Sequence, residues 1–237
     1  MNRRLLITGA GGFLGSRICE YYSNRDGYEA VGVTHRELDI EDFVAVSAFI
    51  KAIRPDYVLH CAAISNTGTC ERNPVLSEKV NVRGTINLAK ACRNAGSRMI
   101  FTSSDQIYNT SHSLEPNREG SEGKPGNVYG RDKKRAEEAM LTYLPDAVAL
   151  RLTWMYDAPS RGRAAGQGLL QKLADALKDR REVEFPVHDY RGITYVWEVV
   201  RHLEEAMGLP GGVYNFGSEN RYNTFDTARL FLRELAG

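Results

Sequence analysis

The sequence alternates short apolar segments with longer stretches of helical spacing, and this alternation limits the folds that the chain can adopt. Residues 4–8 form an apolar segment that runs into glycines, and residues 13–23 then place their apolar side chains on shared helical faces. Strands that alternate with helices of about ten residues or more predict parallel β-α-β units with right-handed crossovers. The predicted fold class is therefore α/β, a doubly wound parallel sheet with helices on both faces.

The remaining elements follow from the same spacing and from turn residues. The predicted strands cover residues 4–8, 29–34, 57–64, 98–103, 147–154, 182–185 and 212–216, with one more that starts at residue 195 and runs into a helix. The predicted helices cover residues 13–23, 42–53, 74–95, 129–144, 169–179 and 224–235, and the helix after residue 195 ends at residue 207. Residues 103–128 and 157–168 are predicted to be loops, the second of them exposed and mobile.

Composition excludes several classes of protein. Lysine plus arginine is 31 and aspartate plus glutamate is 30, so the net charge of 31 − 30 = +1 provides no global attraction to nucleic acid or to anionic membranes. No apolar run approaches the roughly 18 residues that a membrane helix needs. The apolar start is cut off by Thr8 and the following glycines, too early for a signal peptide, so we expect a cytoplasmic protein. The four cysteines and five histidines lack metal-ligand spacing, and no metal site is expected.

The turn after the first strand has the spacing T-G-x-x-G-x-x-G, with glycines at Gly9, Gly12 and Gly15. Gly9 permits a tight turn, Gly12 lets a pyrophosphate approach backbone N–H groups at the helix N-terminus, and Gly15 lets the helix lie close to the strand. The turn is predicted to bind a dinucleotide, and Phe13 and Leu14 lie within it.

The end of the second strand bears on the choice of cofactor. Enzymes that prefer NAD usually carry an acid there, whereas this chain has His35 and Arg36. A guanidinium group suits a 2′-phosphate, so NADP is predicted, with NAD as the alternative and a solvated Arg36 as the other interpretation. Asp39, followed by Ile40, is predicted to accept from the adenine amino group or else to cap the helix that starts near Asp42.

A serine, a tyrosine and a lysine form the second predicted site. Ser104 lies just past a strand end, and Tyr129 and Lys133 are four residues apart at the start of a helix, which places them on one face. A phenol is a poor acid–base catalyst at neutral pH, and a neighbouring ammonium group is expected to lower its pKa. Ser104 is positioned to hydrogen-bond a substrate oxygen on which charge develops.

These motifs together resemble the extended short-chain dehydrogenases/reductases, and within them the dTDP-4-dehydrorhamnose reductase group. The matching segments are the glycine turn, Cys61-Ala62-Ala63, residues 55–58, residues 80–85, Ser103-Ser104-Asp105, residues 127–131 with Lys133, residues 151–156 and residues 191–195. The resemblance implies a Rossmann-like fold, with catalytic residues Ser104, Tyr129 and Lys133 and a supporting role for Asn81. The expected cofactor contacts are Gly9, Gly12, Phe13, Leu14, Gly15, His35, Arg36, Asp39, Ile40, Cys61, Ala62, Ala63, Tyr129 and Lys133.

Two departures from the group concern the substrate. The group usually has tyrosine at the position of Gln106, and its members continue further past the last helix, whereas this sequence ends at Gly237. We therefore expect either fewer contacts to a nucleotide sugar or a smaller substrate. The predicted substrate residues are Asp105, Gln106 and Trp154. Arg151 and Trp154 are interpreted as either functional or structural, and Arg161 and Arg163 as solvated or as contacts to a diphosphate.

The expected function is NAD(P)H-dependent reduction of a keto group on a nucleotide-linked deoxysugar. Residues 1–156 are predicted to form the NAD(P)-binding domain, and residues 157–237 a small α/β substrate lobe interleaved with the sheet. The nucleotide sugar is the expected partner, and a homodimer is a further expectation. Two alternatives remain open. One is an NAD-dependent epimerase or dehydratase, and the other is a non-catalytic NADP-binding module such as the regulatory subunit of methionine adenosyltransferase.

Overall fold

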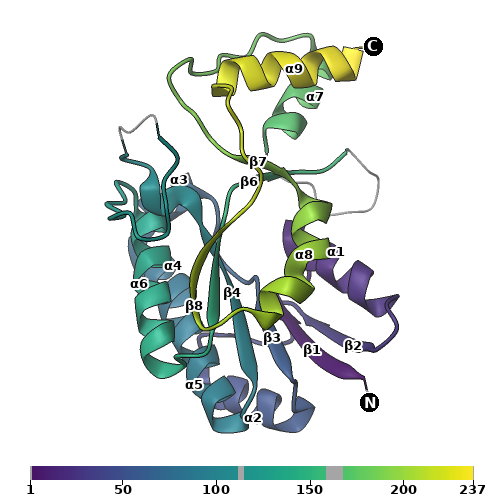
Figure 1. Cartoon of the computed structure of the whole chain (residues 1–237), viewed down its shortest axis with the longest axis vertical. Helices are drawn as coiled ribbons and strands as arrows, with labels where there is room; N and C mark the ends of the chain where they lie inside the picture. The colour runs from purple at the N-terminus through teal and green to yellow at the C-terminus, as the bar shows by residue number, and fades with distance from the viewer. Residues whose placement is uncertain (1, 112–114, 159–167, 237) are drawn as a thin grey trace.

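The computed structural model describes residues 2–111, 115–158 and 168–236. In these residues a parallel sheet of six strands has the order β2-β1-β3-β4-β5-β8 (Figure 1). The strands are β1 (Arg3–Thr8), β2 (Tyr28–Val33), β3 (Tyr57–His60), β4 (Arg98–Ser104), β5 (Val148–Leu152) and β8 (Gly212–Phe216). The strand order reverses between β1 and β3, because the chain adds β2 on one side of β1 and then crosses to the other side. The predicted doubly wound α/β class is confirmed.

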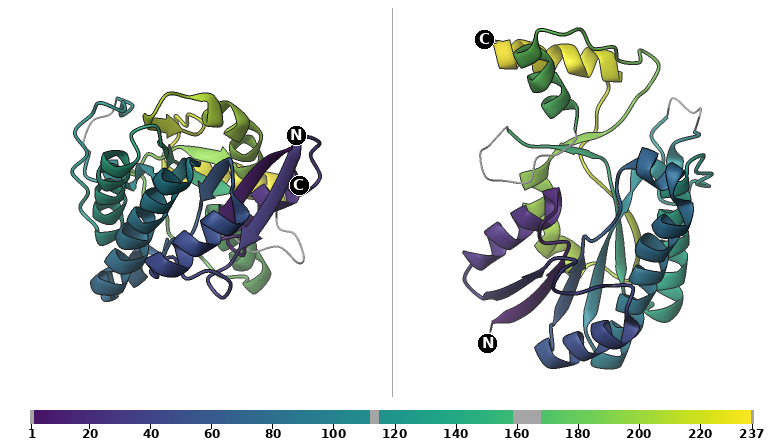
Figure 2. Two further views of the ribbon diagram at one scale, coloured as in Figure 1. Left: turned by 90° about the horizontal axis from the view of Figure 1, so that it is seen from below. Right: turned by 180° about the vertical axis from the view of Figure 1, so that it is seen from behind.

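Helices cover both faces of this sheet (Figure 2). The helices α1 (Phe13–Ser23) and α8 (Val196–Gly208) share one core cluster with the sheet, in which Ile18 and Val200 are fully buried. The helices α2 (Phe43–Ile53), α5 (Thr85–Ala95) and α6 (Val128–Tyr143) share the other cluster. Each buried aliphatic side chain of these clusters contributes roughly 1.5–3 kcal/mol of hydrophobic stabilisation.

The helix predicted over residues 74–95 consists of three pieces. They are α4 (Pro74–Glu78), the π-helix η1 (Lys79–Gly84) and α5. Where η1 passes into α5, the Thr85 hydroxyl donates to the carbonyl oxygen of Asn81 at 2.7 Å. A short helix, α3 (Thr67–Arg72), precedes them and was not predicted, although Asn66 caps it by accepting from the backbone N–H of Thr69.

Four predicted strands differ from the structure. The strand predicted over residues 57–64 ends at His60, and the one over residues 147–154 divides into β5 and β6 (Trp154–Tyr156). The strand predicted from residue 195 is instead β7 (Ile193–Tyr195), which ends where α8 begins. The strand predicted over residues 182–185 is wrong, because Phe185 satisfies its apolar pattern by packing on a helix pair without joining a sheet.

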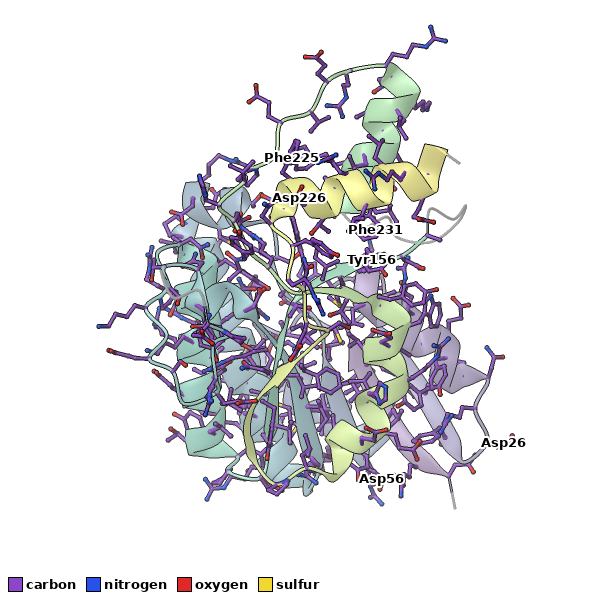
Figure 3. All side chains as sticks on the ribbon, turned by 45° about the horizontal axis from the view of Figure 1, so that its top comes forward. Asp26, Asp56, Tyr156, Phe225, Asp226 and Phe231 are labelled. Atoms are coloured by element: carbon purple, nitrogen blue, oxygen red, sulfur yellow. The ribbon has the colours of Figure 1, made fainter. Side chains whose placement is uncertain are left out.

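A smaller unit lies beyond the carboxyl edge of the main sheet (Figure 1). It consists of the parallel pair β6-β7, the helices α7 (Leu169–Asp179) and α9 (Thr224–Ala236), and a short apolar cluster between them. Tyr156 and Phe231 face each other in this cluster with ring centroids 4.9 Å apart (Figure 3). The chain builds β6, α7 and β7 of the smaller unit and then returns to the main sheet, where α8 packs on one face and β8 forms the edge strand. It then goes back to the smaller unit to form α9.

A buried ion pair joins α1 to the residue after β6. Arg17 donates to a carboxylate oxygen of Asp157 at 2.7 Å, and 2% and 4% of the two side chains are exposed. The expectation of an exposed loop from residue 157 onward is therefore wrong for Asp157 itself. Residues 159–167, with Arg161 and Arg163, lie outside the described residues. Within the described part of the chain, no helix combines the length and the apolar character needed to cross a membrane.

Gly9 and Gly96 provide a matched test of how the fold depends on the first turn. Both have φ of 72°, but a β-carbon on Gly9 would lie 2.7 Å from the backbone nitrogen of Ala62, whereas one on Gly96 meets nothing within 4 Å. Both alanine variants carry the cost of a positive φ, and only Gly9→Ala adds overpacking. We expect urea unfolding to show that Gly9→Ala loses about 1–3 kcal/mol more stability than Gly96→Ala. Equal losses would contradict a tight approach of the turn to Ala62.

Candidate active site

A cavity of about 470 Å³ opens where the strand order reverses, at the carboxyl ends of β1, β2 and β3. In an open α/β sheet this crevice is the usual place for a ligand. Of the residues predicted to contact a cofactor, the lining includes Gly9, Gly12, His35, Asp39, Ile40, Cys61, Ala62 and Ala63. The sequence reasoning missed several apolar lining residues, which read as ordinary core positions: Val33, Leu38, Ile64, Leu76 and Val80. The other residues predicted to contact the cofactor are not among the lining residues: Phe13, Leu14, Gly15, Arg36, Tyr129 and Lys133.

The glycine turn brings the N-terminus of α1 to this cavity. Gly12 is the N-cap of α1 and offers no capping side chain, so the first backbone N–H groups of the helix are available to a ligand. A β-carbon on Gly15 would lie 2.2 Å from the carbonyl oxygen of Gly9, so only glycine lets the helix pack this close to the turn. These features fit the pyrophosphate of a dinucleotide.

The turn after β2 is held by a residue that the sequence reasoning did not single out. Glu37 accepts from both the backbone N–H and the hydroxyl of Thr34 at 2.8 Å, and these bonds lower the pKa of its carboxyl. His35 and Arg36 are exposed in this turn, and His35 lies 3.9 Å from Asp39. Asp39 does not cap α2, since the capping carboxylate belongs to Asp42.

Ser104, Tyr129 and Lys133 come together at the carboxyl end of β4, and all three are buried. The Lys133 ammonium group donates to the carbonyl oxygen of Thr102 at 2.7 Å and lies 4.5 Å from the centroid of the Phe101 ring. It is 5.7 Å from the centroid of the Tyr129 ring. The Ser104 hydroxyl donates to Asp105 at 3.4 Å and accepts from the backbone N–H of Gln106 at 3.2 Å. The structure thus assembles the trio that the sequence predicted.

The pKa of Tyr129 differs from the expectation that it is lowered. Burial raises the pKa of Tyr129 above its ordinary value, and Ser104 only partly offsets this effect. Burial lowers the pKa of Lys133 to about 8. Burial, and not the charge of the Lys133 ammonium, decides the phenol pKa in this structure, where the ammonium donates to the Thr102 carbonyl. The result is a protonated phenol, which is the form that a general acid requires.

Asp105 faces residues of the smaller unit. Burial raises its pKa to about 6, and the guanidinium of Arg191 opposes this rise. Arg191 donates to Asp189 at 2.7 Å and lies 5.1 Å from the centroid of the Trp154 ring. Arg191 is therefore near both Asp105 and Trp154, two of the residues predicted to contact the substrate. The sequence reasoning missed the position of Arg191 and Asp189, because no local pattern places residue 191 opposite residue 105.

Gln106 has a partner within the chain. Its carboxamide oxygen accepts from the side chain of Asn127 at 2.9 Å, and the Asn127 oxygen caps α6 by accepting from Gly130. A β-carbon on Gly130 would lie 2.5 Å from the Gln106 carbonyl oxygen, so the two segments are in tight contact. Gln106 therefore links the Ser104 segment to the helix that carries Tyr129. Its predicted contact with substrate stays a prediction.

The contacts of Arg151 favour the structural interpretation, because its guanidinium group is bonded within the chain. It forms a paired contact with the carboxylate of Glu137, at 3.0 Å and 2.7 Å, and also donates to Tyr108.

Asn81 holds the backbone of Ile64 through both its side-chain oxygen and its side-chain nitrogen, which fits the supporting role implied for it. Across the described ranges, no three His, Cys, Asp or Glu side chains are grouped as a metal site would require.

Three comparisons place this geometry among known proteins. The family model described as RmlD substrate binding domain matches residues 3–236. The dTDP-4-dehydrorhamnose reductase of Mycolicibacterium smegmatis is 31% identical over 97% of this chain and 68% of its own length. Methionine adenosyltransferase 2 subunit beta of Xenopus laevis is 32% identical over 96% of this chain and 70% of its own.

The fold is shared with solved structures. The dTDP-4-dehydrorhamnose reductase of Bacillus anthracis, solved in complex with NADP, superposes with a TM-score of 0.91 at 23% identity, over 100% of this chain and 82% of that one. The six-stranded parallel sheet agrees with this shared fold. The chain belongs to the RmlD substrate binding domain family, among relatives named dTDP-4-dehydrorhamnose reductase.

Proposed function

We propose that this protein is an NADPH-dependent reductase of a keto group on a nucleotide-linked deoxysugar, of the dTDP-4-dehydrorhamnose reductase type. One observation carries the proposal. Ser104, Tyr129 and Lys133 are buried together at the carboxyl edge of a sheet whose adjacent crevice is open beside a glycine turn. The reductases to which this chain is about 30% identical support the substrate class.

The residues divide the chemistry as follows. The bound nicotinamide supplies the hydride. Tyr129 donates its phenolic proton to the carbonyl oxygen of the substrate, and the Ser104 hydroxyl hydrogen-bonds the same oxygen as negative charge develops on it. Lys133 supplies positive charge behind the phenol, which stabilises the phenolate that remains after the proton has left. Burial of all three excludes water from the transfer.

The cofactor is assigned from the two sides of the cavity. The open N-terminus of α1 suits the pyrophosphate, and the exposed turn with His35 and Arg36 suits the 2′-phosphate of NADP. The NADP complex of the Bacillus anthracis reductase supports this choice, with NAD as the alternative.

Residues 157–237, apart from α8 and β8, which pack in the main sheet unit, are proposed as the substrate lobe, together with Asp105, Gln106 and Trp154. Support comes from Arg191, which lies over Trp154 and acts on Asp105 from the smaller unit.

A second candidate is a non-catalytic NADP-binding subunit. The relative named methionine adenosyltransferase 2 subunit beta matches this chain as well as the reductases do. Purified protein that binds methionine adenosyltransferase and oxidises no NADPH with any nucleotide-linked ketosugar would favour this candidate. Tightly bound NAD⁺ in the purified protein would instead favour an epimerase or dehydratase.

Removal of the Tyr129 hydroxyl tests the general acid. We expect Tyr129→Phe to lower kcat by roughly a hundredfold to ten-thousandfold, equivalent to about 3–5 kcal/mol in the barrier. The measurement is the loss of NADPH absorbance with dTDP-4-dehydrorhamnose. Tyr143→Phe, on the same helix, is the matched control and should retain full activity. A Tyr129→Phe enzyme as fast as the control would rule out this role.

The cofactor preference is tested at Arg36. We expect Arg36→Ala to raise the KM for NADPH relative to that for NADH by roughly tenfold to a hundredfold, because a hydrogen bond to a charged group contributes about 1.5–3 kcal/mol. Arg93→Ala removes an exposed arginine from α5 and should leave the ratio unchanged. An unchanged ratio in Arg36→Ala would show that Arg36 is a solvated loop residue.

The pH dependence follows from Lys133. Its pKa is lowered to about 8, so its charge is present below that pH and is lost above it, while the raised pKa of Tyr129 keeps the phenol protonated. We expect kcat for ketone reduction to fall as the pH rises through about 8. Lys133→Arg keeps its charge and should lose this alkaline limb from its residual activity, whereas Lys134→Arg should keep it. The same limb in Lys133→Arg would assign it to another group.

A further inference from the structure

His60, the last residue of β3, is a fully buried histidine that the proposed reaction does not use. Its Nδ1 lies 2.8 Å from the hydroxyl of Thr8, and its Nε2 lies 3.1 Å from the hydroxyl of Thr85. Thr8 ends the strand that leads into the glycine turn, and Thr85 follows the π-helix η1. The ring therefore bridges the floor of the cofactor crevice and the helix that contains Asn81.

The hydrogen bonds around His60 have only one consistent direction. The Thr85 hydroxyl donates its single proton to the carbonyl oxygen of Asn81, at 2.7 Å, since a carbonyl can only accept. The Thr85 oxygen must then accept from His60, which places the ring proton on Nε2. The bare Nδ1 accepts from Thr8, whose oxygen accepts from the backbone N–H of Ala62 at 3.4 Å. Burial and the Lys133 charge lower the pKa of His60 to about 3, so the ring is neutral.

His60 also contacts the residues that hold Lys133. Its ring stacks on Phe101 with centroids 5.5 Å apart and planes at 22°, and the Lys133 ammonium lies 4.5 Å from the centroid of the same Phe101 ring. The backbone oxygen of His60 accepts from the Thr102 hydroxyl at 3.0 Å, and the Thr102 carbonyl accepts from Lys133. Both neighbours of the ammonium group are thus in contact with His60.

A second route reaches the same helix through η1. Asn81 donates to the hydroxyl of Ser77 at 3.2 Å, and Ser77 donates to the carboxylate of Asp132 at 2.6 Å. Asp132 is buried and directly precedes Lys133 on α6. The polar chain from Thr8 through His60 and Thr85 to Asn81 therefore continues to the residue next to Lys133.

We propose that His60 is a positioning residue for Lys133, fixed as the neutral Nε2–H tautomer so that it holds Phe101, Thr102 and the π-turn against the catalytic helix. The value of this role for turnover rests on the proposed function, whereas the position of Lys133 does not. Thr85 is the residue at which to test it, because its hydroxyl is the acceptor that fixes the tautomer.

The tautomer can be measured in the wild-type protein. Long-range ¹H–¹⁵N spectra of the histidine rings, with His60 identified by the signals lost in His60→Asn, should show a neutral Nε2–H ring from pH 8 to pH 5. An Nδ1–H ring, or a ring that becomes charged in this range, overturns the proposal.

The coupling to Lys133 is tested with Thr85→Val, Thr85→Ser and the control Thr142→Val. The Thr142 hydroxyl makes the same bond to a carbonyl four residues earlier, to Glu138 on α6 at 2.8 Å, but lies outside the chain of bonds through His60. Titration of ¹³C-lysine-labelled protein, with Lys133 assigned through Lys133→Arg, reports the group directly. Thr85→Val should raise the Lys133 midpoint by about half a pH unit or more towards its ordinary value, since a loosened surround admits water. Thr85→Ser and Thr142→Val should leave the midpoint at the wild-type value.

Kinetics provide the second reading. Thr85→Val should lower kcat roughly tenfold to a hundredfold with KM for NADPH within about twofold of wild type, because a small displacement at a reacting group costs this much. Thr85→Ser should restore kcat. A Lys133 midpoint that is unchanged in Thr85→Val, or shifted equally in Thr142→Val, overturns the positioning role. A wild-type protein that reduces no ketosugar refutes the proposed function, and the Lys133 titration then still decides this inference.

Discussion

The burial of the Lys133 ammonium group is the constraint on which the rest of the site depends. Within the described residues no carboxylate lies within 4 Å of it, and its hydrogen-bond acceptor is the backbone oxygen of Thr102. Removing an unpaired charge from water is costly, so the surrounding groups must be held where they compensate for the lost solvent. The face of Phe101 and the carbonyl of Thr102 do this, and both belong to β4, which is paired on either side by β3 and β5.

The helix α6, which carries Tyr129 and Lys133, is held by polar contacts at three points along its length. Asn127 caps its start and is held by Gln106, Asp132 is bound by Ser77, and Glu137 pairs with Arg151 of β5. The pair of Glu137 and Arg151 is buried and doubly hydrogen-bonded, unlike exposed pairs such as that of Arg25 and Glu204. Loss of one partner of a buried pair leaves an uncompensated charge, so these contacts restrict α6 to one position relative to Ser104.

The parts of this structure that are local in the sequence could be predicted from it. The bounds of α1 and α7 match their predicted ranges, and the glycine turn and the spacing of Tyr129 and Lys133 were read from neighbouring residues alone. What failed depends on contacts between distant residues. The raised pKa of Tyr129 arises from its burial by the folded chain. Likewise, Arg191 reaches Asp105 only because the chain returns across the sheet edge.

The two pKa shifts at the centre of the site favour one direction of reaction. Burial penalises the charged form of each group, so it holds Tyr129 as the phenol and weakens the hold of Lys133 on its proton. Oxidation of an alcohol would have to begin from the phenolate, which burial disfavours, whereas reduction of a ketone begins from the phenol. In the proposed reaction, a negative charge that forms on Tyr129 is offset in part by the Lys133 ammonium group, which lies 5.7 Å from the centroid of its ring, because opposite charges attract more strongly in a dry surround than in water.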